Sequence, residues 1–284
     1  MDQRFESSRL RNDSSPLILT LKILFGLLIG SFINVLIVRV PKSESIITPG
    51  SHCILCNTPL KWWMNIPLFS FFIFGGKCCY CSGRISWQYP IVELLCAGIW
   101  ILFFNFNHPF ETTSLCLGIC FLLAIAIIDL KHFQIYHGLL IASFIFLATS
   151  LFFGSFSWKY HIAGMVFCPG FIWGVSWIVQ VFNKRKNLGG GDILLAISLG
   201  FYLGPYRSFL MYFIASVFGI LYWVAMMKIK NLDKNPIQIP FGTGMVFGFI
   251  LLEIVLLPSI ISSFKFLEFI IFTDRFLAEL FSLL

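Results

Sequence analysis

The sequence has little charge for its length. Only 12% of its 284 residues are Asp, Glu, Lys or Arg, about half of the roughly 25% that is typical of soluble domains. Hydrophobic residues make up 58% of the chain, Phe alone occurs 34 times, and the mean hydropathy is +0.88. This composition excludes disordered, collagen-like and disulfide-scaffold proteins. It predicts an integral membrane protein.

Polar stretches are also scarce, because apolar runs fill most of the chain. A membrane-spanning helix needs about 20 mainly apolar residues. We expect an all-α integral membrane protein with about eight transmembrane helices, near residues 17–38, 90–106, 113–130, 138–154, 160–182, 192–204, 206–227 and 241–263. The expected domains are a tail and first helix at 1–38, a cysteine-rich loop at 39–89, a membrane core at 90–263 and an amphipathic, lipid-facing tail at 264–284.

Lys and Arg gather on one side of the predicted helices. The loop 39–88 and the turns near 131, 183–190 and 228–235 hold twelve of them, and the opposite turns hold two. Basic residues concentrate in cytoplasmic loops, so the cysteine-rich loop is expected to face the cytoplasm, although Arg4, Arg9 and Arg11 argue for the opposite side. The net charge of +7 therefore indicates sidedness, and no nucleic-acid partner is expected. The twelve are Arg39, Lys42, Lys61, Lys77, Arg84, Lys131, Lys184, Arg185, Lys186, Lys228, Lys230 and Lys234, and the two are Lys159 and Arg207.

Five of the nine cysteines lie in the predicted cytoplasmic loop. Cys53 and Cys56 form one C-x-x-C knuckle, and Cys78 and Cys81 form a second one after 21 intervening residues. This spacing is typical of a four-thiolate zinc site, and the metal would help to fold a loop with little apolar core. Two disulfides are the alternative, which a reducing cytoplasm disfavours. Cys79 is an extra thiol beside a predicted ligand. The remaining cysteines are expected to pack as small apolar residues, and they are Cys96, Cys116, Cys120 and Cys168.

Two aspartates lie at the ends of apolar runs. Asp129 ends the run 121–128, and Asp192 follows three glycines, Gly189, Gly190 and Gly191, at the start of another. Ionisable groups in membrane segments are costly and are candidates for function. Both aspartates fall at the cytoplasmic ends of predicted helices, and so at one depth. Two carboxylates at one depth are what an aspartyl protease needs to activate water and protonate the leaving group.

The two aspartates and the glycine run also have simpler interpretations. Asp192 could cap a helix N-terminus, and Asp129 could form a salt bridge to Lys131 or Lys184. The dipoles of their own helices favour an ionised Asp192 and a protonated Asp129. The glycine run at 189–191 could take positive φ and let an extended substrate approach, or it could only be a flexible link.

Six pieces of sequence point to a known family. They are 30–41, the cysteine loop with Asn65-Ile-Pro67 and 76–78, 89–93, Asp129, 189–192 and 239–242. With these pieces the chain resembles the bacterial type IV prepilin peptidases, which are bifunctional leader peptidases and N-methyltransferases with a G-x-G-D motif. The resemblance covers residues from about 25 to 245.

The resemblance implies roles for particular residues. Asp129 and Asp192 would cleave the basic leader of a prepilin or pseudopilin after a Gly, at the cytoplasmic face of the bacterial inner membrane. The cysteine loop would support methylation of the new N-terminus with S-adenosylmethionine as donor. Glu93 and Asn65 are candidates for this second reaction. Alternatively, Glu93 only pairs with Arg84, and Asn65 only forms the turn before the following proline.

The chain departs from the family pattern at three places. Leu194 replaces a common Lys, Tyr136-His137 replaces a Pro-Asn or Pro-Asp pair, and Thr243 replaces a common Pro. Two other functional classes stay open at this point, namely an ion-coupled transporter that uses the two aspartates and a zinc-stapled scaffold without catalysis. The oligomeric state is left open as well.

Overall fold

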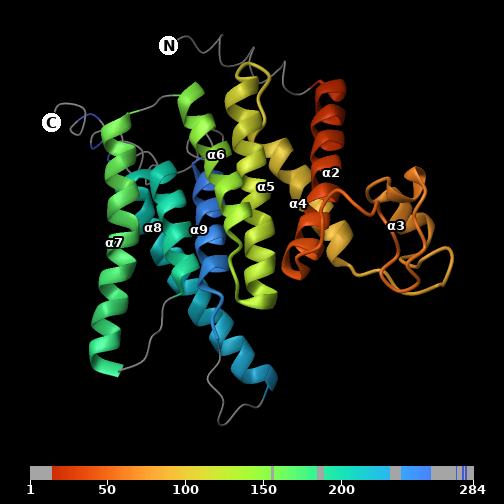
Figure 1. Cartoon of the computed structure of the whole chain (residues 1–284). Coiled ribbons are helices and arrows are strands. Elements are labelled where there is room, and N and C mark those ends of the chain that lie inside the picture. The colour runs from red at the N-terminus through yellow and green to blue at the C-terminus, as the bar shows by residue number, and fades with distance from the viewer. Residues whose placement is uncertain are drawn as a thin grey trace. The chain divides into compact units, whose positions relative to one another are not determined.

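The computed structural model describes residues 15–154, 157–183, 189–230 and 238–256, together with the single residues Thr273, Leu277 and Glu279. Within these residues the regular structure is helical and there is no strand, so the predicted all-α class is confirmed. The predicted tail at 264–284 lies outside the described residues apart from those three positions. The long helices are α2 (Pro16–Arg39), α4 (Gln88–Phe103), α5 (Pro109–His132), α6 (His137–Phe153), α7 (Trp158–Asn183), α8 (Gly190–Lys230) and α9 (Phe241–Val255) (Figure 1).

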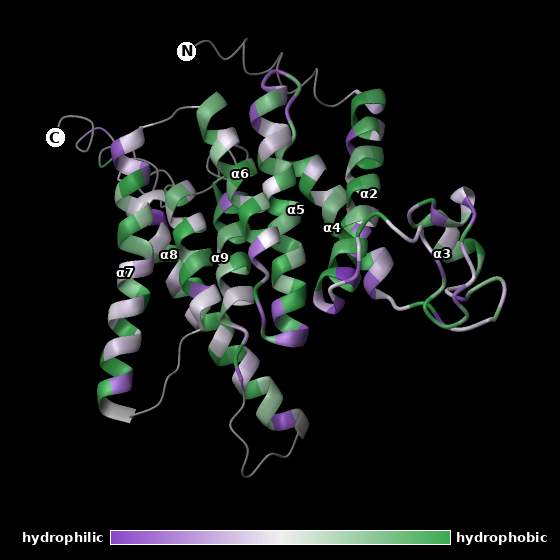
Figure 2. Cartoon of the chain, viewed as in Figure 1, coloured by the Kyte–Doolittle hydropathy of each residue, from purple (hydrophilic) through white to green (hydrophobic). Residues whose placement is uncertain are grey.

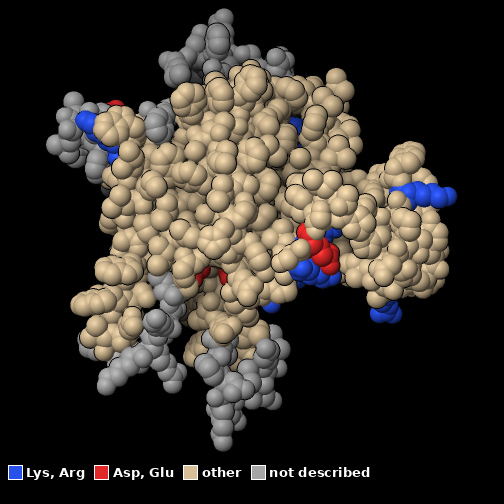
Figure 3. All heavy atoms as spheres, viewed as in Figure 1, with Lys and Arg blue, Asp and Glu red and all other residues tan. Residues whose placement is uncertain are grey.

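The helices have the apolar surfaces expected of a membrane protein. Four of them, α2, α5, α7 and α8, are long and apolar enough to cross a bilayer, and α4, α6 and α9 are apolar but shorter. Hydrophobic residues dominate these helices (Figure 2), and the visible face over them has almost no charged side chains (Figure 3). The structure thus describes four candidate spans, and the count of eight stays a prediction.

The chain separates into two compact units, Met1–Cys120 and Phe121–Leu284, and the boundary falls inside α5. In the first unit, α2 and α4 pack closely through small residues, as is common between membrane helices. A Cβ atom at Gly26 would lie 2.5 Å from Ala97 Cα, and one at Gly30 would lie 2.6 Å from Glu93 Cα. The two glycines therefore allow the backbones of α2 and α4 to come into contact. Because α2 precedes the cysteine loop and α4 follows it, this contact holds the two ends of the loop.

The cysteine loop between α2 and α4 contains only short regular elements. These are the 3₁₀ turns η1 (Val40–Lys42) and η2 (Trp62–Asn65) and the short helix α3 (Phe69–Ile73). Two isolated antiparallel bridges, His52 with Pro59 and Lys77 with Arg84, close the segments that contain the two C-x-x-C knuckles. The regular structure of the loop is thus confined to short, local elements.

In the second unit α8 packs against α6, α7 and α9. The sequence predicted two helices, 192–204 and 206–227, and α8 consists of two helices that meet at a kink at Gly204, where φ is 74° and ψ is 177°. Pro205 follows and lacks the N–H that a continuous helix would use. Gly204 also lies against Tyr160 of α7, whose ring would overlap a Cβ atom at this position. The predicted boundary between the two helices is therefore confirmed.

Candidate active site and metal centre

Asp129 lies in the last turn of α5 and is almost fully buried, with 5% of its surface exposed. Its Oδ2 accepts the backbone N–H of Thr243 at 2.7 Å and lies 2.9 Å from the Thr243 hydroxyl oxygen. Thr243 is the third residue of α9, so the carboxyl group lies at the N-terminus of a second helix. The expectation of a protonated Asp129 considered only the dipole of α5. The dipole of α9 acts on the same group in the opposite direction.

Asp192 is the third residue of α8 and follows the end of the glycine run. Its own N–H donates to the Gly189 carbonyl at 3.2 Å, and its carboxylate is hydrogen-bonded by the Gly189 amide. Only the Asp192 half of a capping box is present, because Gly189 has no side chain to accept the Asp192 N–H, but the helix-capping interpretation still describes part of what Asp192 does. Asp192 also interacts electrostatically with Asp129. The two predicted carboxyl groups are therefore within range of an electrostatic interaction, and neither belongs to an ion pair among the described residues.

Ile135, in the connection between α5 and α6, lies beside Gly191 of α8 and Gly242 of α9. A Cβ atom at Gly191 would be 2.9 Å from Ile135 Cβ, and one at Gly242 would be 3.0 Å from Ile135 Cδ1 and 3.1 Å from Asp129 Oδ2. The first turns of α8 and α9 can approach Ile135 and Asp129 only because both positions are glycine.

Two residues of the glycine run, Gly190 and Gly191, belong to the first turn of α8. Neither has positive φ, so the positive φ that the sequence would allow is not adopted at these two residues. The space around the three residues still differs, because nothing lies within 4 Å of a Cβ atom at Gly190, whereas one at Gly189 would be 3.3 Å from Asp192 Oδ2.

The four knuckle cysteines form a single cluster. The Sγ atoms of Cys53, Cys56, Cys78 and Cys81 all lie within 4.8 Å of one another. In a tetrahedral site with Zn–S bonds of about 2.3 Å, the sulfur atoms are about 3.8 Å apart, and the Sγ atoms of Cys53 and Cys81 are separated by 3.9 Å. The cluster therefore fits the geometry of a four-thiolate metal site.

The two knuckles use the same backbone turn. The residue that follows each knuckle, Asn57 or Ser82, donates its N–H to the carbonyl of the first cysteine at 2.8 or 2.9 Å. Both of these residues have a φ of 55°, a left-handed conformation that is uncommon for residues other than glycine. Two equivalent turns thus direct two sulfurs each toward a common centre.

The thiols of the cluster differ in acidity. Hydrogen bonds from the Thr58 side chain and backbone lower the pKa of Cys56 to about 6. A backbone hydrogen bond from Gly83 also lowers the pKa of Cys81, but partial burial and the three neighbouring thiols outweigh it and raise that pKa to about 11. Four negative thiolates at this distance repel one another, and a bound cation would remove that repulsion.

The other cysteines lie outside this cluster. Cys79 is exposed, and its Sγ is 3.7 Å from Met64 Sδ. All nine cysteines are free thiols, so the alternative of two disulfides is not present in the structure. The four cysteines of the apolar runs are buried within helices, as predicted for small apolar residues, and they are Cys96, Cys116, Cys120 and Cys168.

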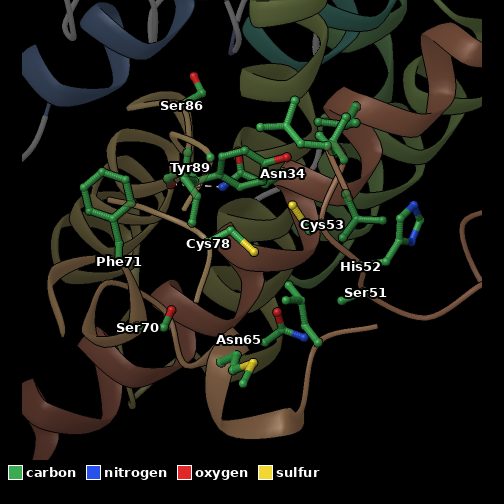
Figure 4. Close-up of a pocket in the computed structure, with 18 of the residues that line it drawn as sticks. Asn34, Ser51, His52, Cys53, Asn65, Ser70, Phe71, Cys78, Ser86 and Tyr89 are labelled. Carbon is green, nitrogen blue, oxygen red and sulfur yellow. Dashed lines mark hydrogen bonds between the residues drawn. The ribbon is translucent and has the colours of Figure 1, made fainter. Parts of the chain in front are cut away.

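A cavity of about 500 Å³ lies in the first unit, between the C-terminal half of α2, the cysteine loop and the start of α4. Its lining includes both methylation candidates, Asn65 and Glu93, as well as Cys53 and Cys78 from the cluster. Figure 4 shows Asn65 and the two cysteines around this space, with Tyr89 of α4 close to them. The structure thus brings together residues that the sequence places far apart.

Glu93 is buried, with 7% of its surface exposed, and its Oε2 accepts the backbone N–H of Leu68 at 2.8 Å. Arg84 also lines the cavity, but no ion pair joins it to Glu93 among the described residues. Asn65 is the last residue of η2, just before the turn at Ile66 and Pro67, so its structural interpretation remains compatible with its position.

Comparisons with known proteins match both units. The model of the bacterial peptidase A24 N-terminal domain matches residues 24–106, and that of the type IV leader peptidase family matches residues 116–224. A prepilin leader peptidase/N-methyltransferase of Pseudomonas aeruginosa is 30% identical over 256 residues, which is 81% of this chain and 88% of the relative. The chain belongs to the type IV leader peptidase family.

Other members of the type IV leader peptidase family are similar over comparable lengths. The Bacillus subtilis protein of the same name is 31% identical over 235 residues, covering 82% of this chain and 92% of the relative. A type 4 prepilin-like proteins leader peptide-processing enzyme of Escherichia coli is 30% identical over 249 residues, covering 78% of this chain and 88% of the relative. No solved structure gives a significant match.

The two family matches divide the candidate residues between them. The type IV leader peptidase match contains Asp129 and Asp192, and the N-terminal-domain match contains the four knuckle cysteines and the cavity. Gly242 and Thr243 lie beyond both matches although they touch Asp129. In the sequence, Thr243 is recognisable only as a departure from a motif, and Ile135 carries no signal. Nothing local in the sequence indicates that either residue lies near an aspartate.

Proposed function

We propose that this chain is a prepilin leader peptidase and N-methyltransferase in which Asp129 and Asp192 hydrolyse the leader peptide bond. The observation that supports this most strongly is the pairing of two carboxyl groups from the last turn of α5 and the first turn of α8. Each of them also accepts a backbone N–H near a helix N-terminus. Family membership supplies the substrate class, because the similar proteins are named for prepilins.

The pair can perform both proton transfers that peptide hydrolysis requires. In an aspartyl protease dyad, two carboxyl groups share one proton. The ionised member takes a proton from the attacking water, and the protonated member donates its proton to the leaving amide nitrogen. The glycine turn before Asp192 would position the substrate, and the open space beside Gly190 leaves room for an extended peptide. We therefore assign Gly189, Gly190 and Gly191 to substrate positioning.

We assign methylation to the cysteine loop and its cavity. Zinc is the metal that suits the donor set of Cys53, Cys56, Cys78 and Cys81, and it would stabilise the loop around the cavity. S-adenosylmethionine, when bound, supplies the methyl group. Glu93 can then take the proton from the new N-terminal ammonium group, so that the neutral amine accepts the methyl.

The cavity offers suitable groups for this second reaction. The Leu68 amide donates to Oε2 of Glu93, and Glu93 lines the cavity. Asn65 supplies an amide donor and acceptor on the loop side of the same space. The volume of about 500 Å³ is within the range of small-molecule sites, which is roughly 300–1,000 Å³.

We place the enzyme in the bacterial inner membrane as a multi-pass protein with the aspartates toward the cytoplasm. The basic residues of the loop and turns support this orientation. The transporter alternative is less consistent with the helix positions, because Asp129 and Asp192 lie at helix ends, whereas transporter sites lie near the midplane of the bilayer. A scaffold without catalysis would not require the two carboxyl groups to be paired.

The test uses the purified full chain in detergent and a peptide with a basic leader, a Gly-Phe junction and an apolar segment. We expect wild-type protein to cut after the Gly, and D129N and D192N to lower kcat by at least about 1,000-fold, as loss of a catalytic group does. The control E111Q changes an acid at the other end of α5, where it pairs with His108. It should cut at the wild-type rate. A D129N or D192N variant with wild-type activity would exclude the dyad.

A further inference from the structure

Thr243 makes two contacts with one oxygen of a catalytic candidate. Its backbone N–H donates to Asp129 Oδ2 at 2.7 Å, and its Oγ1 lies 2.9 Å from the same oxygen. The contact joins residues that are 114 positions apart in the chain. Thr243, in the first turn of α9, therefore holds the carboxyl group of Asp129, in the last turn of α5.

The hydroxyl group of Thr243 has a second neighbour. Its Oγ1 also lies 2.9 Å from the carbonyl oxygen of Ala126, one turn before Asp129 in α5. A hydroxyl has one proton to donate and can accept as well. When Asp129 is ionised, the hydroxyl donates to Oδ2. When Oδ2 carries a proton, it donates to Oγ1, and the hydroxyl turns its own proton toward Ala126.

The same two contacts determine which carboxyl oxygen is free. Oδ2 is engaged by Thr243 and has Gly242 beside it, where even a Cβ atom would be only 3.1 Å away. Oδ1 has no such donor in the described residues. It is therefore the oxygen left to meet water and the neighbouring Asp192.

We propose that Thr243 is a positioning residue for Asp129, which fixes Oδ2 through its hydroxyl and amide in both protonation states and presents Oδ1 to the reaction. The proposal rests on the assignment of Asp129 as a catalytic group. Thr243 lies outside the residues that the two family models match.

Thr243→Val removes the hydroxyl and keeps the amide and the branched shape of the side chain. The variant loses one hydrogen bond to the charged Asp129 carboxylate, and hydrogen bonds to charged groups are strong. We therefore expect kcat for peptide cleavage to fall on the order of tenfold to hundredfold. KM should change less than about twofold, because Thr243 acts on Asp129 and not on the substrate. Thr243→Ser restores a hydroxyl and should recover most of kcat.

Thr149→Val is the matched control. The Thr149 hydroxyl, like that of Thr243, lies against a backbone carbonyl, in this case that of Ile145 in α6. No contact joins Thr149 to either aspartate among the described residues. It should leave kcat unchanged. All variants are compared with wild type for thermal unfolding in the same detergent. A Thr243→Val enzyme with wild-type kcat overturns the proposal, and so does a Thr243→Ser enzyme as slow as the Val variant. A wild-type protein that leaves the peptide uncut refutes instead the peptidase function on which the proposal rests.

Discussion

Two neighbouring glycines provide a sharp test of the site geometry. A methyl group added at Gly190 would meet no atom within 4 Å, whereas one added at Gly191 would lie 2.9 Å from Ile135 Cβ. That atom is attached directly to the backbone, so no rotation of the Ile135 side chain relieves the contact. Gly190→Ala and Gly191→Ala thus make the same chemical change at adjacent positions with opposite consequences.

The size of the effect follows from the distance. Nonbonded carbon atoms are most stable about 3.5–4.0 Å apart, so the first turn of α8 must move by about 0.6–1 Å in Gly191→Ala. Asp192 is the next residue, and a misplacement of about 1 Å in an active site can lower the rate by about 100-fold. Such overpacking also destabilises a protein by about 1–3 kcal/mol. Gly190→Ala should be neutral or stabilising by up to about 1 kcal/mol, because alanine favours helix.

The assay measures kcat for leader-peptide cleavage and the thermal midpoint of each purified variant in detergent. We expect Gly191→Ala to lose on the order of 10- to 100-fold in kcat and to have a lower thermal midpoint. Gly190→Ala should keep the wild-type kcat and at least the wild-type thermal midpoint and raise only KM, because the open space at Gly190 is assigned to the substrate. Equal kcat in the two variants would refute the inferred contact with Ile135, and an unchanged KM in Gly190→Ala would contradict the assignment of Gly190 to substrate positioning.

Two further predictions concern the first unit. Wild-type protein should contain about one zinc ion per chain, measured by elemental analysis of purified protein. Cys78→Ser should lower this zinc content, whereas Cys79→Ser should leave it unchanged. Equal zinc content in the two variants would contradict the four-thiolate assignment. Glu93→Gln should abolish transfer of a labelled methyl group to a pre-cleaved peptide and leave leader cleavage within about twofold of wild type, since it removes only the proton acceptor. Glu111→Gln is the control for both reactions, and normal methylation by Glu93→Gln would exclude the proposed role.

Much of the fold follows from local sequence, because a span needs only a sufficiently long apolar run. Those runs correctly indicated the long helices. The boundary between the predicted helices 192–204 and 206–227 likewise matches the kink at Gly204. The conformation of that kink depends on the packing of α7 against it, including the contact with Tyr160, and it could not be predicted from the local sequence.

The residues of the candidate sites also differ in whether the local sequence could predict them. The cysteine cluster was predictable because each knuckle is a local turn with a recognisable spacing, and the aspartates stood out as acids in apolar surroundings. Thr243 was not predictable, since its contact with Asp129 spans 114 residues and depends on how α9 packs. The opposing dipole of α9 at Asp129 was missed for the same reason.

The most direct test of the central claim is the N-terminal mass of a prepilin co-expressed with this chain. With wild type we expect a pilin that lacks its leader and is heavier by one methyl group. With D129N or D192N the leader should remain, and with E111Q processing should be normal. An intact leader in the presence of wild type, or a trimmed pilin in the presence of either Asn variant, would contradict the assignment of Asp129 and Asp192 as the catalytic pair.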